Sequence, residues 1–123
     1  MPGSAAETSR SRGHAVLIAE PNPLIALDLM ATVGSWGAEV EMLNDLGNGC
    51  QLAVSPALTA AIVDVNLPLE GQQHLIDALR ENGVPIALTT TTLRKSISDR
   101  FPGYVVFEKP VDFAALADWF NDL

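Results

Sequence analysis

The sequence predicts an α/β fold, in which a five-stranded parallel sheet and five helices form a three-layer sandwich. Short apolar runs alternate with helix-like segments along the chain, and this alternation is typical of a parallel sheet covered on both faces. Three of the runs are apolar almost throughout, as expected for strands that are buried on both sides. The length of 123 residues, 48% of them hydrophobic, predicts one globular domain with a core of its own.

Five segments have the length and apolar character of strands. They are residues 14–19, 39–43, 60–65, 85–89 and 104–107. The segment 39–43 (EVEML) alternates between acidic and apolar residues, so we expect a less buried strand there.

Five segments between and after these strands are predicted to be helices. They are residues 24–33, 45–54, 70–81, 93–99 and a last helix that begins after Asp112. Gly47 and Gly49 weaken the second helix, and the pair Asn82-Gly83 supplies a stop signal for the third. Asp112 is a suitable N-cap for the last helix. Apolar residues at the spacing i, i+3, i+4 and i+7 should form the buried stripe of that helix: Phe113, Leu116, Ala117 and Phe120.

Composition and charge argue against several classes of function. The formal net charge of −8 repels phosphate backbones, so we expect no nucleic-acid partner. No apolar run approaches the roughly 20 residues of a membrane-spanning helix, so we expect no membrane partner either. The single cysteine, Cys50, excludes an internal disulfide framework and fits a cytoplasmic protein. We expect residues 1–13 (MPGSAAETSRSRG) to be a disordered tail or a remnant of the expression vector, and 14–123 to be the domain.

Polar residues follow four of the predicted strands at their carboxyl ends, which is where parallel sheets bind ligands. They are Glu20, Asp64, the threonines at 89–92, and Lys109. A carboxylate can attack phosphorus once its charge is screened, a lysine can screen it, and carboxylate and carbonyl oxygens suit a divalent cation. Each of these residues alone is more often a loop cap or part of a surface ion pair. Only their joint placement favours a phosphoryl-transfer site.

Three stretches carry a resemblance to a known family. They are VLIAEPNPLIALDL, AAIVDVNLP and VVFEKPVDFAAL, in this order and spacing. Over residues 15–123 the chain resembles the receiver domains of bacterial two-component response regulators, which have a flavodoxin-like fold. DVNL followed by a short loop is similar to receivers that work with certain alphaproteobacterial sensor kinases. The resemblance implies a phosphorelay signalling protein and not an enzyme.

The resemblance also implies a role for each residue at the predicted edge. Asp64 matches the aspartate that receives a phosphoryl group from a kinase histidine. Lys109 and Thr90 match the lysine and the hydroxyl that contact that group. The groups that would hold Mg²⁺ are Glu20, Asp64 and the backbone carbonyl of Asn66. The Lys109-Pro110 peptide bond is expected to be cis, an isomer that is common only before proline.

Pro21 departs from the pattern of the family. It stands where the family has a second acid that ligates the metal directly, and proline offers neither a carboxylate nor an N–H group. Asn22 and Pro23 instead suit the N-cap and first turn of the following helix. We therefore expect a weakened Mg²⁺ site.

Two functions stay open at this point. In the first, a sensor histidine kinase or phosphotransfer protein phosphorylates Asp64 of a stand-alone response regulator. Because no output domain follows Leu123, the domain would signal through a downstream protein partner, with homodimerisation left open. In the second, the chain is a phosphorylation-independent pseudo-receiver, a constitutive protein-binding module in which Asp64 and Lys109 form a structural pair. An aspartyl phosphatase is disfavoured, because Asn66 stands where such enzymes need a second acid.

Overall fold

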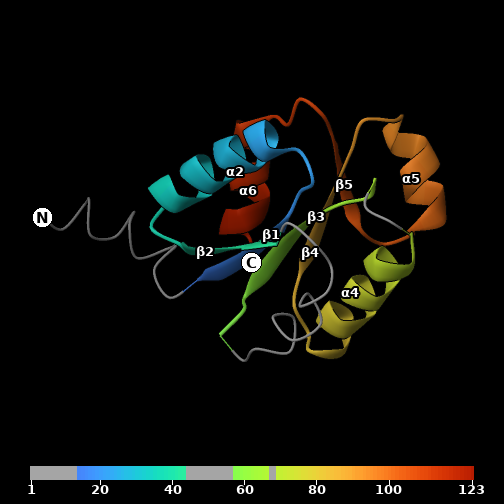
Figure 1. Cartoon of the computed structure of the whole chain (residues 1–123), viewed down its shortest axis with the longest axis horizontal. Coiled ribbons are helices and arrows are strands. Elements are labelled where there is room, and N and C mark those ends of the chain that lie inside the picture. Colours follow the sequence, from blue (N-terminus) through green and yellow to red (C-terminus); the bar gives the residue numbers. More distant parts are fainter. Residues whose placement is uncertain (1–13, 44–56, 67–68) are drawn as a thin grey trace, which may run out of the picture.

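The computed structural model describes residues 14–43, 57–66 and 69–123. Five strands form one sheet in the order β2-β1-β3-β4-β5, and every neighbouring pair is parallel (Figure 1). The strands are β1 (Ala15–Ala19), β2 (Glu39–Leu43), β3 (Ala60–Asp64), β4 (Ile86–Thr90) and β5 (Val105–Glu108). The strand order reverses between β1 and β3, and this switch point opens a crevice at the carboxyl ends of the strands.

Helices cover both faces of the sheet. They are α2 (Pro23–Ser35), α4 (Leu69–Glu81), α5 (Arg94–Arg100) and α6 (Phe113–Asn121). α2 and α6 lie on one face and α4 and α5 on the other (Figure 1), so the predicted three layers are confirmed. The prediction of five helices is corrected to four within the described ranges, and the expected helix 45–54 lies outside them. None of the described helices is long and apolar enough to cross a membrane.

The alternation of side chains along the strands builds two separate cores. Val16 and Ile18 of β1 pack with residues of α2 and α6, whereas Leu17 packs with residues of α4 and α5. This follows from strand geometry, since successive side chains point to opposite faces. β1, β3 and β4 are buried along their whole length, as their apolar sequences predict.

β2 is the edge strand next to β1, and it is less buried than β1, β3 and β4. Its burial alternates between exposed and part-buried positions, and Leu43 is its one buried residue. The alternating acidic and apolar residues of EVEML predict this pattern, which is confirmed.

α6 buries a shorter stripe than the spacing predicts. Leu116 and Phe120 are buried, but Phe113 is 37% exposed, so the prediction for Phe113 is wrong. Phe113 begins the helix, and its side chain lines a hollow against α2 instead of lying within the core. Asp112 is the N-cap as expected, because its Oδ1 accepts hydrogen bonds from two backbone amides of the first turn.

Candidate functional site

Four parallel strands deliver polar residues to one edge of the sheet. Asp64 and Thr90 are the last residues of β3 and β4, and Glu20 and Lys109 directly follow β1 and β5. Because the strands are parallel, their carboxyl ends lie at the same edge. The structure therefore brings together the residues that the sequence places at strand ends.

The charged residues of this edge are buried. Glu20 is 1% exposed and Asp64 is fully buried, and the side chain of Lys109 is only 8% exposed. A buried charge is costly unless it is paired and hydrogen-bonded. The contacts of these three side chains decide whether the edge is stable.

Lys109 bridges the two acids. Its Nζ lies 2.5 Å from Oε1 of Glu20, as an ion pair and not as a well-directed hydrogen bond, and it donates to Oδ2 of Asp64. The second oxygen of each carboxylate accepts a backbone N–H, from Asn22 to Glu20 Oε2 at 3.0 Å and from Asn66 to Asp64 Oδ1 at 2.5 Å. Two carboxylates and one ammonium leave one negative charge in excess.

The environment of Lys109 holds its ammonium in the charged form. Burial alone would lower the pKa of Lys109, but its close contacts with Asp64 and Glu20 and the attraction of both carboxylates outweigh that effect. The pKa of Lys109 is therefore raised above its usual 10.5. Lys109 is a fixed positive charge at neutral pH.

The hydroxyl of Thr90 points to a partner other than the ion pair. Its Oγ1 lies 2.8 Å from Oγ1 of Thr92 and accepts the backbone N–H of Thr92 at 3.0 Å. Among the described residues, no hydrogen bond joins this hydroxyl to Asp64 or Lys109. The backbone of Thr90 is nevertheless tied to the site, because its carbonyl accepts the N–H of Lys109 at 2.7 Å.

The stretch after β1 builds a helix start in place of a second acid. Pro21 is exposed and offers no ligand to the site. Asn22 caps α2, with Oδ1 accepting from the backbone of Leu24 at 2.9 Å and of Ile25 at 3.3 Å. After β5, the Lys109-Pro110 peptide bond is cis.

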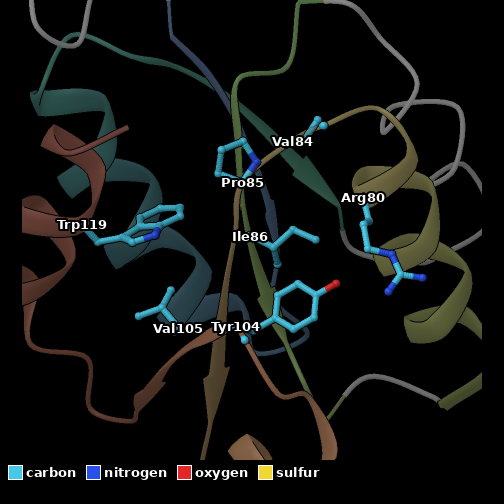
Figure 2. Close-up of a pocket in the computed structure, with 9 residues that line it drawn as sticks. Arg80, Val84, Pro85, Ile86, Tyr104, Val105 and Trp119 are labelled. Atoms are coloured by element: carbon cyan, nitrogen blue, oxygen red, sulfur yellow. The ribbon is translucent and has the colours of Figure 1, made fainter.

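A hollow at the opposite edge of the sheet is separate from these residues. It lies at the amino ends of β4 and β5 and includes Trp119, Tyr104 and Arg80 (Figure 2). None of the residues at the carboxyl ends of the strands lines it. The candidate site is therefore the edge that carries Asp64.

Solved structures of signalling domains share the fold of this chain. SdrG from Pseudomonas melonis Fr1, in its BeF3-activated conformation, is 25% identical with a TM-score of 0.72, over 89% of this chain and 94% of that one. A signal receiver domain of an HD domain-containing protein from Pseudomonas fluorescens Pf-5 is 17% identical with a TM-score of 0.75, over 89% and 92%. The receiver domain of Saccharomyces cerevisiae Ssk1, crystallised with the histidine phosphotransfer protein Ypd1, is 17% identical with a TM-score of 0.72, over 89% and 87%.

The chain has the receiver-domain fold. No protein-family model and no curated protein matches the sequence. The resemblance seen in the sequence is therefore supported by the arrangement of the strands and helices, at sequence identities between 17% and 25%.

Mg²⁺ is the cation that the receiver fold implies. Glu20 and Asp64 supply carboxylate oxygens and Asn66 a backbone carbonyl, so the chemistry of the donors fits Mg²⁺. The candidate site of this chain is nevertheless poor in acids. In the ranges 14–43, 57–66 and 69–123, no three His, Cys, Asp or Glu side chains form a group that could hold a metal ion.

Two residues of this candidate site were not predicted from the sequence. Thr92 holds the hydroxyl of Thr90, and the i, i+2 spacing of two threonines after a strand is a signal that could have identified it. Gln72 of α4 is 1% exposed, and its Nε2 lies 3.5 Å from the carbonyl of Asp64. The helical spacing could have identified it, because Gln72 lies at i of an i, i+3, i+4, i+7 stripe with Leu75, Ile76 and Leu79, whereas its exposed neighbour Gln73 does not.

Proposed function

We propose that this receiver accepts a phosphoryl group on Asp64 from a sensor histidine kinase or a phosphotransfer protein, and that it signals through protein–protein contacts. One observation carries the proposal. The carboxylate of Asp64 lies at the carboxyl end of a central strand and in contact with the ammonium of Lys109. A carboxylate whose charge is screened in this way can act as a nucleophile toward phosphorus.

The reaction is the transfer of a phosphoryl group from a phosphohistidine nitrogen to an oxygen of Asp64. A P–O bond forms while the P–N bond breaks, and the nitrogen keeps the electron pair and takes up a proton. Asp64 becomes an acyl phosphate. The ammonium of Lys109 stabilises the charge that arrives on the phosphoryl oxygens. Mg²⁺, when bound by Glu20, Asp64 and the carbonyl of Asn66, would neutralise more of that charge.

Thr90 supplies the step that turns phosphorylation into a signal. Its hydroxyl would exchange the Thr92 hydroxyl for a phosphoryl oxygen, since its backbone is already tied to Lys109. The exchange shifts a population between two arrangements of the loop after β4. The loop leads into α5. The backbone N–H of Arg94, the first residue of α5, donates to Oε1 of Glu108 in β5 at 2.6 Å. α5, β5 and α6 are therefore the surface that we expect to change its affinity for a downstream partner.

An exposed apolar surface beside the site supports a protein partner. Leu24 and Leu27 on the outer side of α2 are 73% and 55% exposed. A hollow of about 370 Å³ lies between α2 and the loop after β5. Its lining residues are Ile25, Asp28, Leu29, Lys109, Pro110, Val111 and Phe113. The hollow includes the lysine that contacts Asp64, so a protein partner bound there would lie next to the site.

Chemical phosphorylation tests the proposal. Incubation with acetyl phosphate and Mg²⁺ should add the mass of one phosphoryl group to the intact protein. Asp64→Asn should remove the adduct, because an amide oxygen does not form an acyl phosphate under these conditions. Beryllofluoride should shift the amide signals of Asp64, Thr90 and Lys109 in nuclear magnetic resonance (NMR) spectra. An adduct that persists in Asp64→Asn, or the absence of both adduct and shifts, would contradict the proposal.

A phosphorylation-independent binding module is the second candidate. The observation that favours it is the closed state of the site, in which Lys109 pairs both acids and Thr92 satisfies the hydroxyl of Thr90. In that case, saturating beryllofluoride would leave the spectrum unchanged. The domain would then bind its partner with an affinity that Asp64→Asn does not alter.

A further inference from the structure

Two adjoining hollows lie at the amino edge of the sheet, away from Asp64. The hollow at the amino ends of β4 and β5 has a volume of about 410 Å³. A smaller one of about 200 Å³ lies beside it, and the two share Arg80 and Tyr104 in their linings. Sites for small molecules usually have volumes of roughly 300–1,000 Å³. The larger hollow therefore has the size that a small ligand needs.

Two aromatic side chains line the larger hollow, and each is anchored in a different core. Trp119 of α6 packs against the core beneath α2 and α6, whereas Tyr104 packs against the core beneath α4 and α5. The ring of Phe101 holds that of Tyr104 edge to face, with 6.3 Å between the centroids. In the described part of the chain, the Tyr104 hydroxyl and the Trp119 indole N–H have no hydrogen-bond partner. Both groups can therefore bind a ligand.

The charged residues that line the two hollows are both arginines. Arg80 lines both hollows and Arg100 lines the smaller one, in a chain with 15 acids and only 7 lysines and arginines. Arg80 has one surface ion pair, in which Nη2 lies 3.4 Å from Oδ1 of Asp77 and the arginine side chain is 67% exposed. Such exposed pairs contribute little. The guanidinium of Arg100 lies 5.3 Å from the ring centroid of Phe101 and has no ion pair with a described acid. Both guanidinium groups are therefore available to an anion.

We propose that these hollows bind a nucleoside monophosphate, with its base against Trp119 and its phosphate at Arg80 and Arg100. Trp119 and Arg80 lie on opposite sides of the larger hollow, with Pro85 and Ile86 between them (Figure 2). A ligand that reaches both must separate its ring from its anion, as a ribose does. Guanidinium groups bind phosphate oxygens in a bidentate manner, and the two negative charges of a phosphate match two arginines. Aromatic side chains stack on every base, so no particular base is predicted.

The rim of the larger hollow leaves room for the ribose. Gly83 and Gly103 line it with φ angles of +69° and +90°, a range that favours glycine. A Cβ atom at either position would meet no atom within 4 Å, so the space beside these two turns is open. The middle of the ligand can therefore lie against the backbone.

The net charge of −8 is compatible with this ligand. At physiological ionic strength, charges more than about 8 Å away are largely screened, so the arginines of the lining dominate. A nucleic-acid strand would extend its further phosphates over the rest of the acidic surface. The proposal is therefore limited to a single nucleotide.

The test is an NMR titration of the full chain with AMP, GMP, CMP and UMP. Divalent cations are left out, so that no ion carries the phosphate to Asp64. The chain has two tryptophans, Trp36 and Trp119, and their indole N–H signals can be assigned with Trp36→Phe. We expect each nucleotide to move the Trp119 signal and to leave that of Trp36, which lines neither hollow, in place. Adenosine should bind about tenfold or more weakly than AMP, because it lacks the phosphate.

Four variants sharpen the test. Arg80→Gln and Arg100→Gln should each weaken the binding of AMP about tenfold and leave that of adenosine unchanged, since each removes one partner of the phosphate. Trp119→Leu should weaken the binding of AMP and of adenosine about tenfold or more, because both lose the stacking of the base. Arg94→Gln is the matched control. It removes the same charge from an exposed residue that lines neither hollow, and it should bind AMP as the wild type does.

Two results of the titration would overturn the proposal. One is a Trp119 signal that none of the four nucleotides moves, and the other is AMP affinity that Arg80→Gln and Arg100→Gln together leave unchanged. A Trp119 signal that moves with protein concentration instead would assign the hollow to a second copy of the chain, and one that moves only with hexaglutamate would assign it to an acidic protein segment. The inference is independent of the proposed function. Asp64→Asn should bind AMP as the wild type does, so the two proposals fail separately.

Discussion

The two edges of the sheet are stabilised in opposite ways. At the carboxyl edge, two acids and a lysine are buried in mutual contact. At the amino edge, rings pack on one another, with the Phe120 centroid 4.8 Å from that of His14 and 5.5 Å from that of Trp36. Aromatic packing stabilises a fold directly, whereas a buried ion pair is often no better than apolar residues of the same volume. The comparison teaches that aromatic packing stabilises the amino edge, whereas the carboxyl edge is stable only while its three buried charges stay paired.

The largest expected effect is that of Lys109→Met on stability. The substitution leaves Glu20 and Asp64 buried side by side without a cation. Removing one member of a buried ion pair costs about 3–5 kcal/mol. We expect a loss of this size in the free energy of unfolding, measured by urea denaturation.

A triple variant checks the interpretation of that loss. Glu20→Gln, Asp64→Asn and Lys109→Met together remove all three charges while keeping the volumes. Because a neutral replacement of a whole buried ion group is often nearly without cost, most of the stability should return. A Lys109→Met variant as stable as the wild type would remove the contrast between the two edges.

Phe120→Leu tests the amino edge and should have the next largest effect. Phe120 is 2% exposed and loses both ring contacts in this variant. Each aromatic pair contributes roughly 0.5–1.5 kcal/mol beyond its buried area, so we expect a loss of about 1–3 kcal/mol. Phosphorylation of the folded variant should be unchanged. A change in phosphorylation with no loss of stability would show that the two edges are not separate in their roles.

The pH dependence of stability sharpens the role of Lys109. Its pKa is raised in the folded protein, so the folded state binds the proton more tightly than the unfolded state does. This contribution is fully present below the ordinary value of 10.5 and is lost as the pH rises through the folded pKa. The difference in unfolding free energy between the wild type and Lys109→Met should shrink above pH 10.5. Lys95→Met, which changes an exposed lysine, should show no such trend.

Much of the fold could be predicted from the sequence, because the signals are local. Strand–helix alternation predicts the parallel sheet, and parallel strands necessarily bring Glu20, Asp64 and Lys109 to one edge. The N-cap roles of Asn22 and Asp112 follow from side chains that can accept backbone N–H groups. The exposure of Phe113 could not be predicted in this way, since helical spacing describes the face of a helix and not how far the sheet extends beneath it.

The pairing within the site could not be predicted either. Positions 89–92 all carry the same residue, threonine, yet Thr89 and Thr90 are buried and Thr91 and Thr92 are exposed. The register of β4 against its neighbours decides which hydroxyl meets which partner, and the predicted end of this strand was one residue short. The sequence also gives no sign that Lys109 contacts both acids and not Asp64 alone, because that depends on the distance between β1 and β5 across the sheet.

The smallest expected effect, that of Thr92→Ala, tests the hydroxyl of Thr90. The variant removes the contact between the two hydroxyls but keeps the backbone N–H of residue 92 as a donor to Thr90. One part-buried hydrogen bond contributes about 0.5–1.5 kcal/mol, so stability should fall by no more than this. Without that contact the resting arrangement is less stable by the same free energy. The affinity for beryllofluoride should therefore rise by a factor of up to about ten.

Thr91→Ala is the matched control, because the hydroxyl of Thr91 bonds to Asn66 and not to Thr90, and it should leave the affinity unchanged. Equal affinity in Thr92→Ala and the wild type, measured by NMR titration, would mean that Thr90 plays no part in binding the phosphoryl analogue, and the switch would then have to lie in Lys109 alone.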